Sequence, residues 1–491
     1  MPHETLVPER GSNLLANLAR YMLFSNSYRG SMIYPAEGTL DPGVRYPTFL
    51  SGSNRNQWGV GENSYLRVLQ AEVPEEYTAR LKTAHYENLC AEVIRVFLAS
   101  IFRPGYVVDR ESIRASLTGG FESIYENIDL KGNSIEDFLQ EVMTLGLVYG
   151  WVGVFTTQPQ GVVVETLADQ KDVELRPYSR IYTPEDIWNW GINSQDGDWD
   201  WVLLSDAEDT WLWVYRDEWY RVDGEGRILE SGLNPVGRVP LDLYLCDANV
   251  GRTGDEPFGL SSIKDIAFIN LDVFQQWSLL GELIRKSNYP SLHIKMPYEQ
   301  YSKSMKDAKR ALPVGPGWHL VTEADVDWIS PAPTSIQEAR ATLGLLIGEV
   351  KRVAGIGTRS EESIEAHSGL ALAWEYSDKL TLIQMRAESL RRFETSLWAT
   401  YDSYIGVGIP HETLKYPATF VTSPKLEDMD ELQKMLDARL PLEIVRTQAW
   451  DLAYKRYSHK GNLPEIKDSI DTWDPYSTGE KETDDRPPSE D

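Results

Sequence analysis

Three helical patterns between Gly259 and Gly406 limit the folds that are open to this chain. The first runs from Ser261 to Asn288 and repeats apolar residues at steps of three and four, with Asn270 as its one polar position. The second runs from Thr334 to Ala354, and the third begins at Ser368 and continues to about Tyr404. At 1.5 Å per residue the third helix spans ~55 Å, a length that few monomeric globular cores need.

The apolar seam of the first helix, which includes Asn270 and Trp277, predicts packing against another helix of this chain or of a neighbouring subunit. An ordinary core helix explains the seam equally well. The second helix opens with the capping-box pattern Ser335-Ile-Gln-Glu338. Gly344 and Gly348 lie one turn apart on it and lower its helix propensity. We therefore expect another helix to approach closely at these two glycines.

The first half of the chain groups helices and antiparallel strands in blocks, which predicts an α+β fold. Pro74 opens an apolar stripe at steps of four that predicts one helix as far as Ile101, with His85 in the core. Ser134 is the expected N-cap of a second helix, which runs to Gly150. Aromatic and β-branched strands follow at 151–155, 201–204, 211–215 and 219–222.

The formal net charge of −27 argues against a protein that grips nucleic acid statically. It suits either no contact with nucleic acid or a surface past which a polyanion slides. Cys90 and Cys246 are the two cysteines, and their apolar surroundings predict buried, inert thiols and a reducing compartment. The sequence has no signal-peptide pattern and no run of ~18 apolar residues, so we expect no membrane insertion.

A basic insert between the first two helices departs from the acidic composition. Between residues 285 and 310 it carries seven basic residues against Glu299 and Asp307, a local excess of +5. This pattern predicts either a docking surface for an acidic partner or DNA phosphates, or a solvated helix face over 302–312. The residues we single out as candidate contacts are Lys295, Lys303, Lys306, Lys309 and Arg310.

A polar loop from Gly355 to His367 joins the second helix to the third. Its glycines supply backbone freedom, so it can be a loop that faces a ligand or a channel, or a plain surface connection. The candidate channel-facing residues are Arg359, Glu361, Glu362 and His367.

Motifs of catalysis are scarce in this chain. Gly232 to Arg238 has the glycine spacing of a phosphate loop but lacks the Lys and Ser/Thr that bind phosphate and magnesium. The histidines are too far apart to suggest a local metal motif. We therefore expect no enzymatic activity, no cofactor and no metal site.

Several short motifs, in this order, resemble those of the portal proteins of tailed bacteriophages. They are Pro74-Glu-Glu-Tyr-Thr-Ala-Arg80, Gly132-Asn-Ser-Ile-Glu-Asp-Phe138, Arg176-Pro-Tyr-Ser-Arg-Ile-Tyr182, Ile187-Trp-Asn-Trp190, Pro235-Val-Gly-Arg-Val-Pro240 and the helix with Ile266, Asn270 and Leu271. The resemblance extends from about residue 70 to 405; residues 1–70 and the acidic tail match nothing in it.

The resemblance implies the following division of residues 74–459, and composition predicts the two terminal regions. The regions are an N-terminal arm (1–73), an α+β wing (74–260), a first stem helix (261–288), a clip (289–333), a second stem helix (334–354), a tunnel loop (355–367), a long wing helix and strand (368–424), crown helices (425–459) and an acidic, disordered tail (460–491). It also implies inter-subunit packing of the stem at Asn270, Trp277, Gly344 and Gly348.

The function that the resemblance implies is mechanical. A homo-oligomeric ring, typically a dodecamer, would form a channel at one capsid vertex of the virion for entry and exit of double-stranded DNA. It would be assembled in the cytoplasm of a host bacterium. Its expected partners are the terminase large subunit, the major capsid protein and head-tail adaptor proteins.

Two other functions remain open from the sequence. One is a structural capsid or baseplate component without a DNA channel. The other is an aromatic-rich binding module for glycans that uses Trp201, Trp211, Trp213 and Trp219, although tryptophans in a sheet core explain the same pattern more simply.

Overall fold

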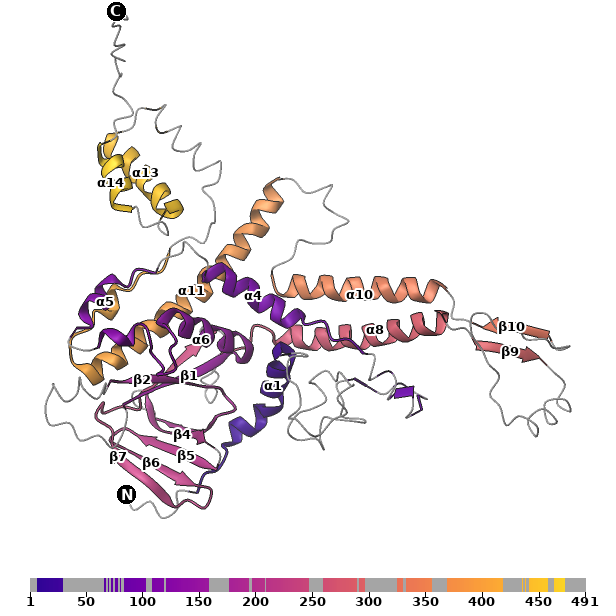
Figure 1. Cartoon of the computed structure of the whole chain (residues 1–491), viewed down its shortest axis with the longest axis horizontal. Helices are drawn as coiled ribbons and strands as arrows, with labels where there is room; N and C mark the ends of the chain where they lie inside the picture. Colours follow the sequence, from indigo (N-terminus) through magenta and orange to yellow (C-terminus); the bar gives the residue numbers. More distant parts are fainter. Residues whose placement is uncertain are drawn as a thin grey trace, which may run out of the picture.

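The computed structural model describes most of the chain. The described residues are 7–29, 84–102, 108–118, 121–158, 176–193, 197–207, 209–246, 259–288, 291–295, 325–329, 333–355, 369–417, 441–457 and 463–472, with single positions between 66 and 80 and at 435 and 438. The fold is α+β, as the sequence predicts. In Figure 1 a layered body carries a long helical arm at one end.

The centre of the body is a three-stranded antiparallel sheet in the order β2-β1-β8. Its strands are β1 (Trp151–Thr157), β2 (Tyr178–Tyr182) and β8 (Leu241–Leu245). Successive side chains of a strand point to opposite faces. Val152 and Val154 therefore join a helical core on one face, while Trp151 and Phe155 join a second core on the other.

The helical layer contains α1 (Ser12–Arg29), α4 (Leu89–Ile101), α6 (Ile135–Tyr149) and the long α11 (Gly369–Ile405). The predicted N-cap of α6 is confirmed, because the Ser134 side chain accepts a hydrogen bond from the backbone N–H of Asp137. Gly150 ends α6 in the left-handed conformation at φ 93°. Short helices α5 (Glu111–Ser116), η3 (Glu122–Ile124) and η5 (His411–Thr413) complete this side.

The other layer is a five-stranded antiparallel sheet in the order β3-β4-β5-β6-β7. Two of its glycines lie opposite tryptophans on the next strand: Gly191 pairs with Trp201 and Gly232 with Trp219. A Cβ at either glycine would lie within 2.4 to 2.7 Å of the indole nitrogen, so the missing side chain makes room for the ring. The strands are β3 (Ile187–Ile192), β4 (Trp199–Ala207), β5 (Thr210–Tyr215), β6 (Glu218–Asp223) and β7 (Ile228–Leu233).

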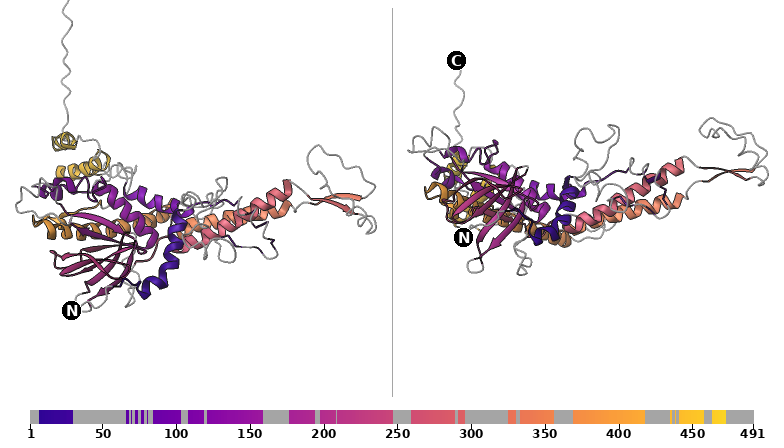
Figure 2. Two further views of the ribbon diagram at one scale, coloured as in Figure 1. Left: turned by 60° about the horizontal axis from the view of Figure 1, so that its bottom comes forward. Right: turned by 90° about the horizontal axis from the view of Figure 1, so that it is seen from below.

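The arm consists of two long helices that pack along each other and a hairpin at their far end. Helix α8 (Lys264–Asn288) leads outward to strand β9 (Ser291–Lys295), and β10 (Asp325–Ile329) leads back to α10 (Pro333–Val353). β9 and β10 pair antiparallel. The views of Figures 1 and 2 agree that the arm projects away from the layered body.

Helix α11 is fixed in the body by buried polar contacts as well as by apolar packing. Glu394 lies between the guanidinium of Arg110 and the hydroxyl of Tyr416. Asp242 of β8 accepts hydrogen bonds from Ser396 at 2.5 Å and from Thr400 at 2.6 Å. These contacts hold the second half of α11 against the central sheet.

Three predicted helix starts are corrected by the structure. The single helix expected from Pro74 to Ile101 is wrong, because residues 84–88 are not helical and Asn88 caps α4. His85 is consequently exposed, with its ring against that of Trp277. Ser335 is not an N-cap, because α10 already begins at Pro333. Ser261 precedes α8 and donates its hydroxyl hydrogen to the carbonyl of Val148 at 2.6 Å.

At the C-terminal side, helix α13 (Leu442–Tyr457) agrees with the predicted second crown helix. The prediction of a disordered tail from residue 460 is wrong in part, since α14 (Leu463–Thr472) is helical. The ammonium of Lys467 lies 5.8 Å from the ring centre of Trp450, which links α14 to α13. The predicted helix at 426–440, the strand at 420–421 and the rest of the tail lie outside the described residues.

Both cysteines are buried, as predicted. Burial raises the pKa of the Cys90 thiol to about 12, which keeps it protonated and unreactive. Among the helices in the described ranges, none is long and apolar enough to cross a membrane.

Candidate functional site

The base of the arm is held by residues of the same chain that precede α4. The side-chain amide of Asn270 on α8 donates a hydrogen bond to the hydroxyl of Tyr86, and both residues are buried. About two turns further on, the indole nitrogen of Trp277 donates to Glu87 at 2.9 Å. The structure thus gives Asn270 and Trp277 partners within the chain, and the inter-subunit contact expected of them stays a prediction.

A buried ion pair strengthens the same attachment. Arg80, which is 1% exposed, binds both carboxylate oxygens of Glu72 at 2.7 Å and donates to the hydroxyl of Ser278 on α8 at 2.8 Å. The hydrogen bonds from Arg80 lower the pKa of Glu72, so the pair stays ionised. A guanidinium that is buried and paired in two places fixes the angle at which the arm leaves the body.

Helix α10 has two apolar sides, of which only one is covered. Leu343, Val350 and Ala354 are buried on the side that packs against α8 and the body. The opposite side carries Ala341, Gly344, Leu345 and Gly348, which share one face at helical spacing. Leu345 is 76% exposed. Among the described residues, no heavy atom outside the adjoining backbone of α10 lies within 4 Å of the position that a Cβ at Gly344 or Gly348 would occupy.

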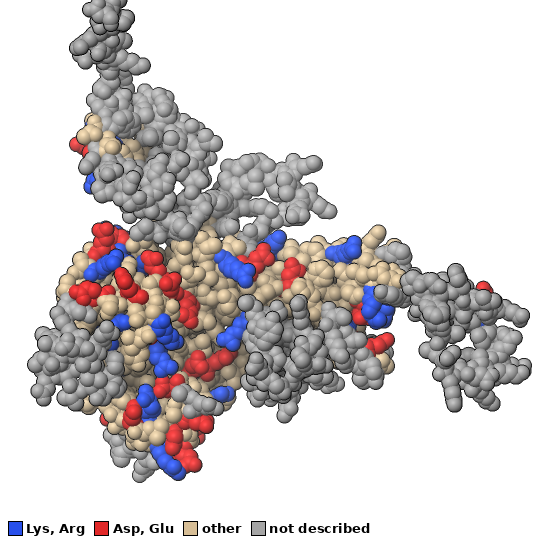
Figure 3. Space-filling model, viewed as in Figure 1, with Lys and Arg blue, Asp and Glu red and all other residues tan. Residues whose placement is uncertain are grey.

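The close approach of a helix that the sequence predicts at these glycines is therefore not made within the described part of the chain. Leu345 is a candidate contact residue for such a helix, and the sequence reasoning missed it. The run Leu-Gly-Leu-Leu-Ile-Gly from 343 to 348 is apolar around the whole helix, a signal of burial on two sides. In the view of Figure 3 uncharged surface covers much of the arm, and acidic and basic side chains are scattered along it as they are over the body.

One of the five predicted clip residues lies in the hairpin at the tip of the arm. Lys295 ends β9, is exposed, and lies directly opposite Asp325 on β10. The other four, Lys303, Lys306, Lys309 and Arg310, lie outside the described residues, as does the helix predicted at 302–312.

The loop between α10 and α11 is described only at its ends. Gly355 ends α10 with φ at 66°, and a Cβ there would lie 2.9 Å from Leu382 of α11. The start of the loop is thus fixed close to α11 by a residue that has to be small. The candidates Arg359, Glu361, Glu362 and His367 lie outside the described residues.

The four tryptophans of the glycan hypothesis do not form one exposed surface. Trp211 and Trp219 are buried. Trp201 and Trp213 are partly buried and pack on each other with ring centres 5.0 Å apart. Trp219 and Trp213 also face opposite sides of the five-stranded sheet, because they belong to different core clusters.

No family model matches the chain, and no curated protein matches it. Among solved structures it resembles chains of gene transfer agent (GTA) particles. The first belongs to the neck of an empty particle computed with C6 symmetry, with a TM-score of 0.37 and 14% identity over 72% of this chain and 86% of that chain. The second belongs to the neck of a native particle computed with C12 symmetry, with a TM-score of 0.37 and 14% identity over 77% of this chain and 94% of that chain.

A third is a chain in the virion of a native gene transfer agent particle, with a TM-score of 0.32 and 13% identity over 68% of this chain and 82% of that chain. Likenesses at these TM-scores and identities carry no weight for the function of the chain.

Proposed function

We propose that this chain is a subunit of a portal, a ring at one capsid vertex through which double-stranded DNA enters and leaves a virion. The observation that carries the proposal is the arm of α8 and α10, whose outward side is apolar and uncovered at Gly344, Leu345 and Gly348. In this proposal α8 and α10 are the stem helices, and the α+β body is the wing.

Burial of the apolar side of α10 would favour association of the arm with a neighbouring subunit. Burying a leucine side chain contributes about 1.5–3 kcal/mol, and glycines on the same face let a second helix approach closely. An arm that buries α10 against a different face of its neighbour makes a head-to-tail contact. Such contacts close into a ring when the rotation between subunits allows it.

The charge of the chain is consistent with a channel for DNA. At a net charge of −27 the protein repels a polyanion, so duplex DNA would pass without being held. The positive insert at residues 285–310 lies between the two stem helices, where the proposal places docking of the terminase and later of head-tail adaptor proteins. We propose a mechanical role, in which the hydrolysis of ATP belongs to a separate motor protein.

The first test is the mass and shape of the purified protein, by light scattering and negative-stain electron microscopy. We expect a closed ring with a central hole and a mass of roughly twelve times that of the 55.8 kDa chain. Leu345→Glu should shift the protein to monomers, because it places a charge in the apolar contact. Leu345→Met keeps the apolar surface and should leave the ring intact.

A stable two-fold oligomer, or rings that form equally well with Leu345→Glu, would contradict the proposed role of α10. An assembly without a hole wide enough for duplex DNA would instead support a structural capsid or baseplate component.

A further inference from the structure

The two edges of the five-stranded sheet differ in how they are protected. At β3 the backbone N–H of Gly11 donates to the carbonyl of Trp188 at 2.8 Å, and α1 lies against the same strand. β7 pairs with β6 alone, and its outer edge meets no other strand in the described ranges. Edge strands that offer free N–H and C=O groups are ready to pair with another chain.

The side chains of β7 are unusually apolar for a free edge. Ile228, Leu229 and Leu233 are 54%, 53% and 83% exposed. Proteins commonly protect a free edge with lysine, proline or a short strand. Glu230 is the one charged residue of β7, and it is bound to Arg221 of the neighbouring strand. An apolar edge of this kind indicates a surface that another protein covers.

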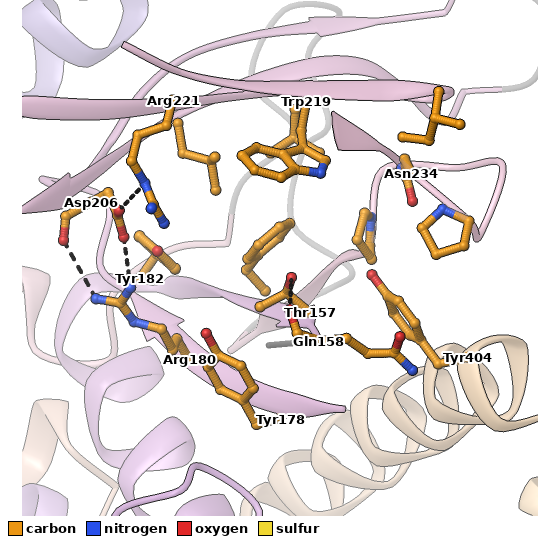
Figure 4. A pocket seen from close by; sticks show the side chains of 16 residues that line it. Thr157, Gln158, Tyr178, Arg180, Tyr182, Asp206, Trp219, Arg221, Asn234 and Tyr404 are labelled. Atoms are coloured by element: carbon orange, nitrogen blue, oxygen red, sulfur yellow. Dashed lines mark hydrogen bonds and ion pairs between the residues drawn. The ribbon is translucent and has the colours of Figure 1, made fainter. Parts of the chain in front are cut away.

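A cavity of about 270 Å³ opens at the end of β7, between the five-stranded and three-stranded sheets. Figure 4 shows its lining, in which Trp219 lies on one side, Tyr178 on the other and Tyr404 and Asn234 at one end. Ten of the sixteen residues that line it are aromatic or apolar, and they include Phe155, Leu233 and Pro235. The exposed Leu233 belongs both to the edge and to this wall, so the two features are continuous.

The charged residues that line the cavity, Arg180, Asp206 and Arg221, are all engaged in ion pairs. Arg180 binds Asp206 at 2.6 Å, and Arg221 binds the other oxygen of Asp206 at 2.9 Å and Glu230 at 2.5 Å. Two guanidinium groups thus face two carboxylates, as the dashed lines in Figure 4 show for Asp206. A site whose charges are already paired favours an uncharged occupant, because a charged one would lose its hydration without gaining a free counter-ion.

One hydrogen-bond donor of the wall is unused. Trp219 is 8% exposed, and its indole nitrogen is buried without a partner in the described part of the chain. By contrast, the Asn234 side chain donates to the carbonyls of Tyr215 and Arg238 and accepts from the N–H of Val236. A buried N–H that lacks an acceptor is unfavourable, and a carbonyl oxygen of an occupant would offset this cost.

We propose that β7 and the cavity beside it form a docking site for an extended, uncharged segment of a partner protein. The segment adds a strand to the free edge of β7, where its backbone supplies the missing hydrogen bonds. One of its apolar side chains enters the cavity next to Trp219, and a carbonyl oxygen accepts the indole N–H. This is strand addition with a single side-chain anchor.

A randomised display library of capped peptides of about seven residues, the length that spans a strand of this size, tests the proposal on the full chain. We expect enrichment of uncharged peptides that carry a large apolar residue or proline at one fixed position. Leu233→Lys should weaken their binding at least tenfold without affecting folding, because the side chain is exposed. Trp219→Ala should weaken it to a similar extent.

The matched control is Ile192→Lys, which makes the same kind of change on the opposite edge of the sheet. It should leave binding unchanged. N-methylation of the peptide at alternate positions should abolish binding only for the set that faces β7. Enrichment of charged peptides, no enrichment at all, or binding that is indifferent to Leu233→Lys would overturn the proposal.

Discussion

Glu394 carries its charge in the interior and has a full set of partners. It is 0% exposed and accepts from Arg110 at 2.6 and 3.0 Å, from the indole of Trp398 at 3.1 Å and from Tyr416 at 2.7 Å. Burial by itself would lower the pKa of Arg110, but the Glu394 carboxylate raises it above its ordinary value. Arg110 therefore stays charged at neutral pH.

We predict that Glu394→Ala lowers the free energy of unfolding by up to about 3–5 kcal/mol, because it leaves the buried Arg110 charge with only the longer contact, 3.3 Å, to the exposed Glu136 among the ion pairs of the described residues. Glu388→Ala on the same helix removes a carboxylate whose contacts to Arg391 and Arg392 are near the surface. Its cost should be about 0–1 kcal/mol. Urea unfolding of both variants measures the difference, and equal costs would show that the buried pair does not stabilise the body.

At the scale of elements, local signals predicted well where a helix or strand is defined by its own residues. The Ser134 cap and the strands with alternating aromatics, such as Trp211 to Tyr215, appear where the sequence places them. The steps of four from Tyr77 to Ile101 failed at residues 84–88, because Tyr86 and Glu87 bind side chains of α8 instead of continuing a helix. No local pattern encodes such a contact across 184 residues.

The sequence likewise predicted only part of the candidate site. Periodicity revealed the two arm helices, and the glycines of α10 indicated an approach that the single chain does not make. It missed Leu345, since a search for one apolar stripe ignores a second stripe on the opposite face. The exposed edge of β7 was also missed, because exposure at a sheet edge depends on strand order.

Two helical glycines, one beside open space and one in tight packing, predict opposite effects of substitution by alanine on stability. Gly344 on α10 has open space at its Cβ position, so Gly344→Ala should stabilise the isolated subunit by about 0.5–1 kcal/mol. If a neighbouring helix passes there, the same change should weaken the ring. Thermal unfolding of the monomeric Leu345→Glu background and the ring fraction by light scattering separate the two effects.

The control is Gly146 on α6, where a Cβ would lie 2.1 Å from the ring of Tyr244. Gly146→Ala should destabilise the subunit by about 1–3 kcal/mol through overpacking. A Gly344→Ala variant that is both more stable and fully assembled would contradict the close packing proposed at α10.

The whole molecule separates into a body that carries most of the core and an arm whose two helices extend that core toward the tip. The main apolar cluster includes residues of α8 and α10, such as Phe274 and Leu343, but no described residue between 289 and 333. The tip can therefore change without disturbing the core, which suits a part that meets other proteins.

This modularity predicts the effect of removing the tip. Ser291 and Ile329 are paired across the β9–β10 hairpin, so a short glycine-containing turn can replace the residues between them and still join α8 to α10. The shortened chain should keep its melting temperature and should still form rings, because the contacts of α8 with α10 remain. In particles it should fail to package DNA, because the proposed docking surface with Lys295 is gone. A lower melting temperature or loss of rings would place the insert in the structural core of the subunit instead of at a partner's docking site.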